Sequence, residues 1–535
     1  MKNSQLILLA AFSAILLALP WLGFMPGWIL FVAFLPLMIV EDHIFQQRKT
    51  ESSIAFFGYA YLSFWLWNAL STWWIVHSTL AGGVLIVFLN ATFMAGVWWL
   101  FHLMKRRFHI RTANLSLVTF WISFEYLHFN WEIAWPWLSL GNGFANQVKL
   151  IQWYEYTGVF GGTLWILIMN LLFFQVYKYI SVKGFKWVIP QLTWLTIAMA
   201  LPIIYSMRQY HDYRETGRGC EIVILQPNID PYLEKFSGMS QEKQLSLLVN
   251  LADSLTTAST EYVVGPETAL HLLDENDKIL HHPYINPLRQ RTQHSPHLNY
   301  IMGATTRKIF DPVDKIPPTA RKFENDSVQY YDLYNAALLI NQGDSIQTYH
   351  KSILVSGVEK MPFAKYLTFL ENYIIDLGGT TGSLGTQPEP TNFKSAEGDQ
   401  VAPIICFESV FGAYVTEFTK KGAGLIVIIT NDGWWKNTPG HRQHLSFARL
   451  RAIETRRGIA RSANTGISAF INQRGEIIQQ TSWWERTALR GTLNLNNQLT
   501  FYVRFGDYIA RISSFLSVLL LLLLLANLRM GKLKK

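Results

Sequence analysis

The sequence predicts a membrane-embedded α-helical bundle joined to a layered α/β domain. Half of the 535 residues are hydrophobic and only 16% are charged, which is too apolar for an ordinary soluble domain. The apolar residues dominate residues 1–206 and 510–528, whereas residues 207–509 alternate between strand-like and helix-like segments. We therefore expect seven membrane helices in 1–206, an α/β domain in 207–509, and a last membrane helix with a basic tail in 510–535.

About eight segments are apolar and long enough to cross a bilayer, whose hydrocarbon core takes about 20 helical residues. They are expected near residues 5–22, 26–41, 53–75, 81–103, 113–130, 157–177, 188–206 and 510–528. The first follows Lys2 and begins like a secretory signal, but no A-x-A-like cleavage motif follows it and a second apolar segment starts almost at once. We expect this first segment to be retained as a membrane helix.

Basic residues cluster beside alternate spans. The clusters are Lys2; Arg48 and Lys49; Lys105, Arg106, Arg107 and Arg111; Lys178, Lys183 and Lys186; and Arg529, Lys532, Lys534 and Lys535. If all eight spans form, every cluster lies on one side of the membrane, and the positive-inside rule makes that side the cytoplasm. Residues 207–509 are then expected outside the cytoplasm. Membrane orientation also accounts for much of the net charge of +9, so this charge does not indicate a nucleic-acid partner.

The aromatic segment Phe124–Asn142 lies on the predicted outer side. It suits either an interfacial belt of aromatic side chains or a lipid-facing platform beneath the α/β domain. Glu125, near the end of a predicted span, is a candidate functional residue because ionisable side chains at membrane depth are costly.

The α/β part contains short apolar runs that end in turn residues, as buried strands do. Strands are expected at 220–229, 261–268, 299–308, 333–341, 402–408, 424–432 and 466–475, with helices at 240–258 and 441–457. No G-x-G-x-x-G follows the first strand and no P-loop motif is present, which argues against a nucleotide cofactor. His281, His282, His294 and His297 lack a metal-binding spacing, so no metal is expected. Two cysteines, Cys220 and Cys406, form no disulfide framework.

Three strand ends carry ionisable residues: Glu267, Lys351 and Cys406. A cysteine at a strand-to-helix turn meets unpaired backbone N–H groups and a positive helix dipole, which favours a thiolate. By itself Cys406 could equally be a small apolar residue that ends a buried strand. Together the three suit acyl transfer through a thioester, in which a carboxylate removes the thiol proton and an ammonium group stabilises the oxyanion.

The order of Glu267 in PET, Lys351 in YHKSILV and Cys406 in ICFES resembles the nitrilase (carbon–nitrogen hydrolase) superfamily, as does the block Ile429–Ile471. This resemblance implies an αββα sandwich with a Glu-Lys-Cys triad. With the membrane spans, the motifs EYL, PWL, GN and GGT are similar to those of the apolipoprotein N-acyltransferase family. They lie at Glu125–Leu127, Pro136–Leu138, Gly141–Asn142 and Gly161–Thr163.

The resemblance also implies roles for single residues. Glu267 would be the general base, Cys406 the nucleophile and Lys351 the partner of the oxyanion. Supporting roles would fall to Glu359, Glu408 and Phe407, where the two carboxylates are either structural or catalytic. The expected substrate-binding residues are Phe236, Asn335 and Phe363, and Arg461, Ser462 and Asn464 match as site architecture.

The chain departs from the family pattern at three places. Phe407 stands where a tyrosine is common, the lysine loop reads VSGVE instead of VPFGE, and Lys235–Phe236 replaces a lipid-contacting tryptophan. These changes bear on substrate fit more than on the chemistry. The residues around Phe236, Met361–Leu370 and the aromatic segment could form an apolar entrance that keeps water from Cys406.

By this resemblance the chain is an acyltransferase with a phospholipid donor and a diacylglyceryl-lipoprotein acceptor. It would be a monomer in the bacterial inner membrane, with its catalytic domain in the periplasm and no cofactor. One alternative is a membrane-tethered amidase that uses water as the acceptor. Another is a receptor or transporter whose nitrilase domain is degenerate, although intact triad residues argue against this.

Overall fold

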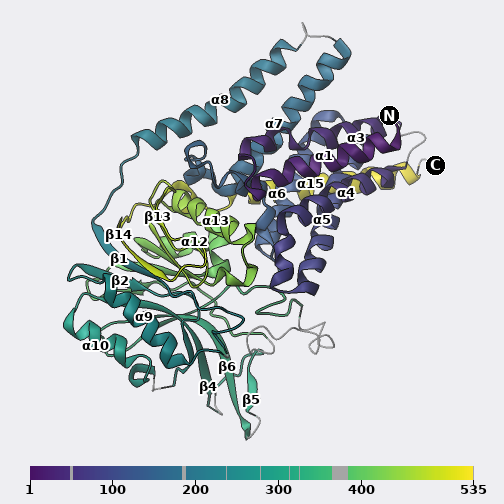
Figure 1. Ribbon diagram of the computed structural model, residues 1–535. Coiled ribbons are helices and arrows are strands. Elements are labelled where there is room, and N and C mark those ends of the chain that lie inside the picture. Colours follow the sequence, from purple (N-terminus) through teal and green to yellow (C-terminus); the bar gives the residue numbers. More distant parts are fainter. Residues whose placement is uncertain are drawn as a thin grey trace. The chain divides into compact units, whose positions relative to one another are not determined.

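The computed structural model describes residues 1–47, 52–183, 188–236, 238–276, 279–311, 314–323, 326–363 and 383–533 (Figure 1). It divides into two compact units. The helical unit comprises Met1–Val76, Leu80–Asp212 and Phe505–Lys535, and the α/β unit comprises His77–Thr79 and Tyr213–Arg504. Five of the basic residues used to orient the spans, Arg48, Lys49, Lys186, Lys534 and Lys535, lie outside the described residues.

The helical unit has a helix at each predicted span. These are α1 (Asn3–Leu22), the pair α2 (Leu30–Ala33) and α3 (Leu35–Gln46), α4 (Ser53–Thr72), α5 (Leu80–Arg107), α6 (Ile110–Phe129), α7 (Tyr154–Lys183), α8 (Ile189–Asp212) and α15 (Tyr508–Leu533). By length and composition, six helices of the described chain could cross a membrane. They are Asn3–Leu22, Gly27–Gln46, Leu80–Arg107, Tyr154–Ser181, Ile189–Asp212 and Tyr508–Arg529.

The helices α4 and α6 account for the difference between eight predicted spans and six. Both have 20 residues, but their polar and aromatic side chains lower their hydropathy. α4 packs against α1 and α5, and α6 packs against α5, α7 and α15. Inside such a bundle polar side chains can pair with each other, as Asn68 of α4 does with Asn90 of α5 at 2.7 Å.

Glu125 fastens α6 to two other parts of the helical unit. One carboxylate oxygen accepts hydrogen bonds from Trp121 Nε1 at 2.9 Å and from the backbone N–H of Leu140 at 2.8 Å. The other accepts from Thr163 Oγ1 at 2.7 Å, and Thr163 Oγ1 accepts from Gly141 N at 3.1 Å. Glu125 is buried, so these bonds compensate the loss of water. They give Glu125 a structural role, and the functional role that its depth suggested stays a prediction.

The second half of the aromatic segment is interior, which argues against a platform of exposed rings. Pro136 to Asn142 are all buried. Trp137 stacks on Trp135 with a ring separation of 5.5 Å and lies 5.0 Å from the ring of Trp74. The segment folds back into its own unit, where the bonds to Glu125 hold it.

Two sheets form the α/β unit, and their strands carry the residues of the site. The first has the order β14-β1-β2-β4-β6-β5, with β3 beside β4 and β7 beside β6, and the second the order β13-β12-β11-β10-β9-β8. The first consists of β1 (Gly219–Gln226), β2 (Thr260–Val264), β3 (Leu270–Asp274), β4 (Asn299–Phe310), β5 (Arg321–Phe323), β6 (Asp326–Ile340), β7 (Gln347–His350) and β14 (Thr487–Asn494). The second consists of β8 (Phe393–Lys394), β9 (Gln400–Ile405), β10 (Leu425–Thr430), β11 (Ile459–Ala463), β12 (Ala469–Ile471) and β13 (Ile477–Gln480).

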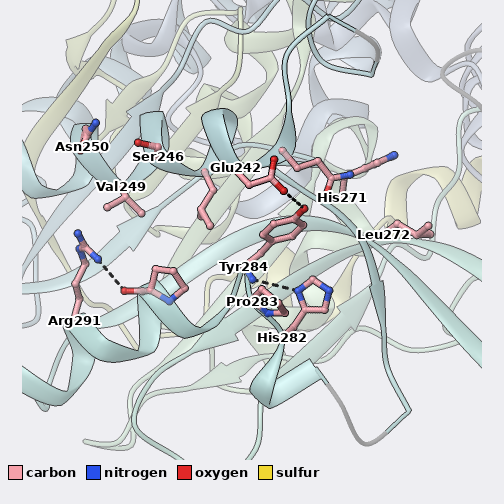
Figure 2. A pocket seen from close by; sticks show the side chains of 13 residues that line it. Glu242, Ser246, Val249, Asn250, His271, Leu272, His282, Pro283, Tyr284 and Arg291 are labelled. Atoms are coloured by element: carbon pink, nitrogen blue, oxygen red, sulfur yellow. Dashed lines mark hydrogen bonds between the residues drawn. The ribbon is translucent and has the colours of Figure 1, made fainter.

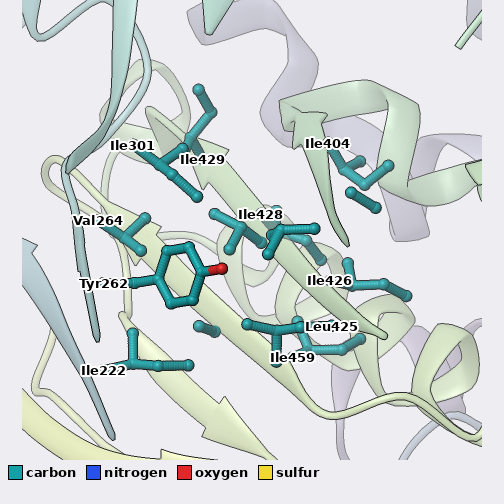
Figure 3. Packing of buried hydrophobic residues seen from close by; sticks show 14 of the residues in the cluster. Ile222, Tyr262, Val264, Ile301, Ile404, Leu425, Ile426, Ile428, Ile429 and Ile459 are labelled. Carbon is teal, nitrogen blue, oxygen red and sulfur yellow. The ribbon is translucent and has the colours of Figure 1, made fainter. Parts of the chain in front are cut away.

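The sheets pack face to face, with helices on their outer faces (Figure 1). Alternate residues of β1 point to opposite faces, so Ile222 and Ile224 join the core between the sheets, whereas Val223 and Leu225 join a second core with α9. Figure 3 shows the first core, where Ile222 and Tyr262 face Ile426 and Ile428 of β10. The helices of one outer face are α9 (Gln241–Leu255) and α10 (Asn286–His294), and those of the other are α12 (Gly412–Lys420) and α13 (Pro439–Thr455). The predicted αββα sandwich is confirmed.

Candidate active site

The three strand-end residues come from both sheets. Glu267 lies in the turn after β2, Lys351 directly follows β7, and Cys406 directly follows β9. The strands β2 and β9 lie in parallel arrays, whose carboxyl ends gather side chains at one edge. The turn that carries Glu267 rests on β4 at Gly303, where a Cβ atom would lie 2.4 Å from the carbonyl oxygen of Pro266. A glycine at this position therefore lets the turn approach.

A lysine between two carboxylates forms the centre of the site. Lys351 Nζ lies 2.8 Å from Glu359 Oε1 and 3.3 Å from Glu267 Oε1. Asn335 of β6 donates from Nδ2 to the same two oxygens, at 3.0 Å and 2.7 Å respectively, and its carbonyl accepts the backbone N–H of Lys351 at 2.8 Å. Asn335 therefore fixes the spacing of the carboxylates and the lysine.

The carboxylates of Glu267 and Glu359 differ in the number of their oxygens that accept hydrogen bonds. The second oxygen of Glu359 accepts the backbone N–H of Val355 at 2.8 Å, so both of its oxygens hold protein groups. Within the described part of the chain, no hydrogen bond reaches Oε2 of Glu267. That oxygen is the available proton acceptor of the cluster.

Lys351 keeps its charge. Burial lowers the pKa of its ammonium group, but the negative charges of Glu359 and Glu267 outweigh this and raise it above the usual value. A buried ammonium held by two carboxylates is a fixed positive charge, which suits the stabilisation of an oxyanion.

Cys406 occupies a strained turn. Its φ of 51° lies in the left-handed region, which is uncommon for a residue other than glycine, and a short 3₁₀ helix, Cys406–Val410, follows instead of an α-helix. Its side chain is partly exposed. Burial and the charge of Glu267 raise the pKa of the thiol well above its ordinary value, and Lys351 offsets this only in part. These surroundings favour the protonated thiol over the thiolate that the strand-to-helix position suggests, so attack by the thiol would require a base.

Glu408 joins the two sheets beside Cys406. One of its oxygens accepts the backbone N–H of Ile405 at 2.9 Å. The other accepts Tyr349 OH at 2.7 Å and the backbone N–H groups of Ser352 and Ile353 at 2.7 Å and 3.2 Å. These bonds hold the end of β9 against the loop that carries Lys351, which gives Glu408 a structural function, and a direct catalytic role stays a prediction.

A buried polar network lies behind Cys406, and the sequence predicted only some of its members. His444 Nε2 lies 3.2 Å from the carbonyl oxygen of Cys406 and 3.0 Å from Ser409 Oγ, which also donates to that carbonyl at 2.7 Å. His444 Nδ1 lies 3.0 Å from Asp432, which is paired with Arg461 at 2.6 Å. Arg461 had matched a family motif, but only the fold brings His444 of α13 to the nucleophile.

The expected substrate-binding and supporting aromatics lie in different surroundings. Phe236 is 37% exposed and stacks on Trp434 at a ring separation of 6.2 Å. Phe363 is 38% exposed, so it does not fill the core, but residues 364–370 of the predicted entrance lie outside the described residues. Phe407, by contrast, is buried and packs on Phe411 at 5.1 Å.

Two further features lie in the α/β unit. A cavity of about 880 Å³ opens beside α9 and α10, and His271 and Leu272 line its β3 side (Figure 2). The carboxylates of Glu261, Glu397 and Asp399 lie close enough to share a cation, but Arg218 already pairs with Glu261 and Asp399.

Comparisons with known proteins agree with this architecture. The family model "Apolipoprotein N-acyltransferase N-terminal domain" matches residues 13–172, and the "Carbon-nitrogen hydrolase" model matches residues 221–498. The chain is 29% identical to the apolipoprotein N-acyltransferase of Chlorobaculum tepidum, over 90% of this chain and 89% of that one. It is 27% identical to that of Geobacter metallireducens, over 94% and 92%. A solved amidase of the nitrilase superfamily from Nesterenkonia AN1 aligns over 55% of this chain and 97% of its own, at 13% identity and a TM-score of 0.36.

The two family models account for both units, since one matches helices of the membrane part and the other covers the sheets with Glu267, Lys351 and Cys406. The chain therefore belongs to the carbon–nitrogen hydrolase family and carries the N-terminal domain of the apolipoprotein N-acyltransferases.

Proposed function

We propose that this protein is an N-acyltransferase that moves an acyl chain from a phospholipid to the N-terminal amine of a diacylglyceryl-cysteine in lipoproteins. The observation that carries the proposal is the carboxylate–ammonium–thiol cluster of Glu267, Lys351 and Cys406, in a chain whose helical unit can lie in the membrane with both substrates. The names of the similar proteins supply the substrate class.

The first half-reaction forms a thioester. Glu267 Oε2 takes the proton of the Cys406 thiol as Sγ attacks the ester carbonyl carbon of the phospholipid. Lys351 stabilises the oxyanion of the tetrahedral intermediate. When the intermediate collapses, the carbon–oxygen bond to the glycerol breaks, and the leaving alkoxide takes the proton from Glu267. The products are the acyl-Cys406 thioester and a lysophospholipid.

The second half-reaction forms an amide. The neutral α-amine of the acceptor, whose reference pKa is about 8, attacks the thioester carbonyl and gives a proton to Glu267. Collapse breaks the carbon–sulfur bond, and the departing Cys406 thiolate recovers that proton. Because the structural evidence leaves Glu267 with one free oxygen and engages both oxygens of Glu359, we assign the proton transfers to Glu267 and a supporting role to Glu359.

A membrane-tethered amidase would use the same cluster with water as the second nucleophile. The lifetime of the thioester distinguishes the two. Purified protein incubated with a phospholipid labelled in its acyl chain should accumulate a labelled, hydroxylamine-sensitive thioester. We expect it to persist without an acceptor and to decay at least about tenfold faster when a diacylglyceryl-cysteine peptide is added. A thioester that hydrolyses without acceptor as fast as it transfers would support the amidase instead.

We also propose that the enzyme is a monomer of the bacterial inner membrane, with the α/β unit in the periplasm. The orientation is supported by the basic clusters, which lie on one side when all eight predicted segments, α4 and α6 included, span the membrane. Alkaline phosphatase, which is active only outside the cytoplasm, should be active when fused after Gly343, in the exposed turn between β6 and β7, and inactive when fused after Lys535. The opposite pattern would reverse the orientation and remove the lipoprotein acceptor.

A further inference from the structure

A second lysine lies beside Glu267, and the reaction above does not use it. Lys235 is 6% exposed, and its Nζ donates to the main-chain oxygen of Glu267 at 2.9 Å. Its backbone is fixed at both ends, since its N–H donates to Asp230 O at 2.9 Å and its carbonyl accepts Gln244 Nε2 at 2.8 Å. The ammonium group is therefore held in place at the wall of the site.

The charge of Lys235 is not neutralised by an ion pair with any described residue. Lys351 is paired with two carboxylates, and Arg461 is paired with Asp432, whereas the hydrogen bond described for Lys235 goes to a neutral carbonyl. An ammonium group has three donors, so two remain after the bond to Glu267. A buried positive charge without a counter-ion is costly, and an anionic ligand would relieve that cost.

The charges around Lys235 also indicate that its ammonium group is positively charged and lacks a counter-ion among the described residues. Burial lowers the pKa of Lys235 to about 8, although the Glu267 carboxylate acts in the opposite direction. The charge of Lys235 also acts on His271 of β3, where burial together with that charge lowers the pKa of the imidazole. Near neutral pH Lys235 is therefore largely charged, next to a largely neutral imidazole.

The side of the site near Lys235 also offers apolar surface. Its Nζ lies 5.9 Å from the ring centre of Phe236, which is exposed and lies against both Trp434 and His271. A positive charge beside exposed aromatic rings matches an amphiphile that has an anionic group next to its acyl chains.

We propose that Lys235 binds the phosphodiester of the acyl donor and so selects phospholipids over uncharged glycerolipids. The inference rests on the proposed function. In a glycerophospholipid the ester that reacts and the phosphate are attached to the same glycerol, so an ester at Cys406 brings the phosphate close to the turn of Glu267. The donor's anion would then be the counter-ion that Lys235 lacks.

The test measures thioester formation alone, without an acceptor, in the full-length enzyme in detergent. The donors are palmitoyl-oleoyl-phosphatidylglycerol and palmitoyl-oleoyl-glycerol, which has the same esters but no phosphate. We expect Lys235→Met to lower kcat/KM about 10- to 100-fold more for the phospholipid than for the glycerolipid, mainly through KM, because the loss of the hydrogen bond to Glu267 is common to both donors. Lys235→Arg should retain most of the activity with the phospholipid. The matched control is Lys243→Met, which removes an exposed charge from α9.

Equal losses with both donors would overturn the proposal, because Lys235 would then only position Glu267. A second readout is independent of the neutral donor. With the phospholipid, the wild-type kcat/KM should fall as the pH rises through about 8, where Lys235 loses its proton, while Lys235→Arg should remain active to higher pH. An identical fall in both proteins would also overturn it.

If the wild type forms no thioester with either donor, the proposed acyltransferase function fails instead.

Discussion

Replacement of Cys406 by alanine should abolish thioester formation and acyl transfer, by a factor on the order of 10⁴ or more, because it removes the thiol of the cluster, and the other cysteine, Cys220, is buried in the core. The fold should persist, since the substitution removes one partly exposed sulfur atom and alanine remains compatible with the short helix that follows. We expect the free energy of unfolding to change by about 1 kcal/mol or less. The measurements are labelled-acyl capture and thermal unfolding of the purified protein.

Cys220→Ala is the matched control for this prediction. Cys220 is fully buried in the core between the sheets, at the start of β1. Its removal should cost about 1 kcal/mol of stability through a small cavity, and it should leave acyl capture intact. If Cys220→Ala abolished capture while Cys406→Ala retained it, the nucleophile would be assigned wrongly.

Replacement of Glu267 by glutamine should slow thioester formation by about 10³-fold, in the middle of the range for the loss of a general base. Glutamine keeps an acceptor for Asn335 and Lys351, so the geometry should survive. The amide cannot take the thiol proton, and burial still raises the pKa of that thiol although the charge of Glu267 no longer does, so the proton must pass to hydroxide from solvent. The rate of the variant should therefore increase with pH across the range in which the thiol stays protonated.

Glu359→Gln tests whether Glu359 only supports the site while Glu267 acts as the base. Glu359 also contacts Lys351 and Asn335, but its second oxygen holds the backbone of Val355, where the amide N–H₂ of glutamine would oppose an N–H group. We expect about a tenfold loss of activity together with lower thermal stability, and no new pH dependence. Single-turnover rates from pH 6 to 9 compare the two variants. A larger catalytic loss in Glu359→Gln would exchange the two roles.

The sequence was most informative where one physical rule acts along a short segment. The run LIVIIT, Leu425–Thr430, is apolar throughout because a strand of a parallel array is buried on both faces, and it forms β10 as predicted. The helix expected at 441–457 appears as α13, two residues earlier at each end. The strand expected before Lys351 forms β7, whereas β14 was missed, since its polar residues and its antiparallel pairing carry little local signal.

The sequence predicted which residues form the site, but it did not predict their burial or their contacts. The strand-end positions of Glu267, Lys351 and Cys406 were visible in the sequence, but the protonation state of the thiol depends on burial and on a carboxylate from another sheet. The role of Lys235 is a similar case. Its contact is with the backbone of Glu267, and a side chain that bonds to a distant carbonyl leaves no pattern in its own neighbourhood.

The assembly of the cluster from two sheets has a consequence for the maturation of the protein. Glu267, Asn335 and Lys351 belong to the first sheet and Cys406 to the second, and β14, the last strand to be synthesised, pairs with β1, the first. Glu267 and Lys351 are synthesised before Cys406, but they meet the thiol only when the two sheets pack on one another. We therefore expect the cluster to assemble together with the core between the sheets.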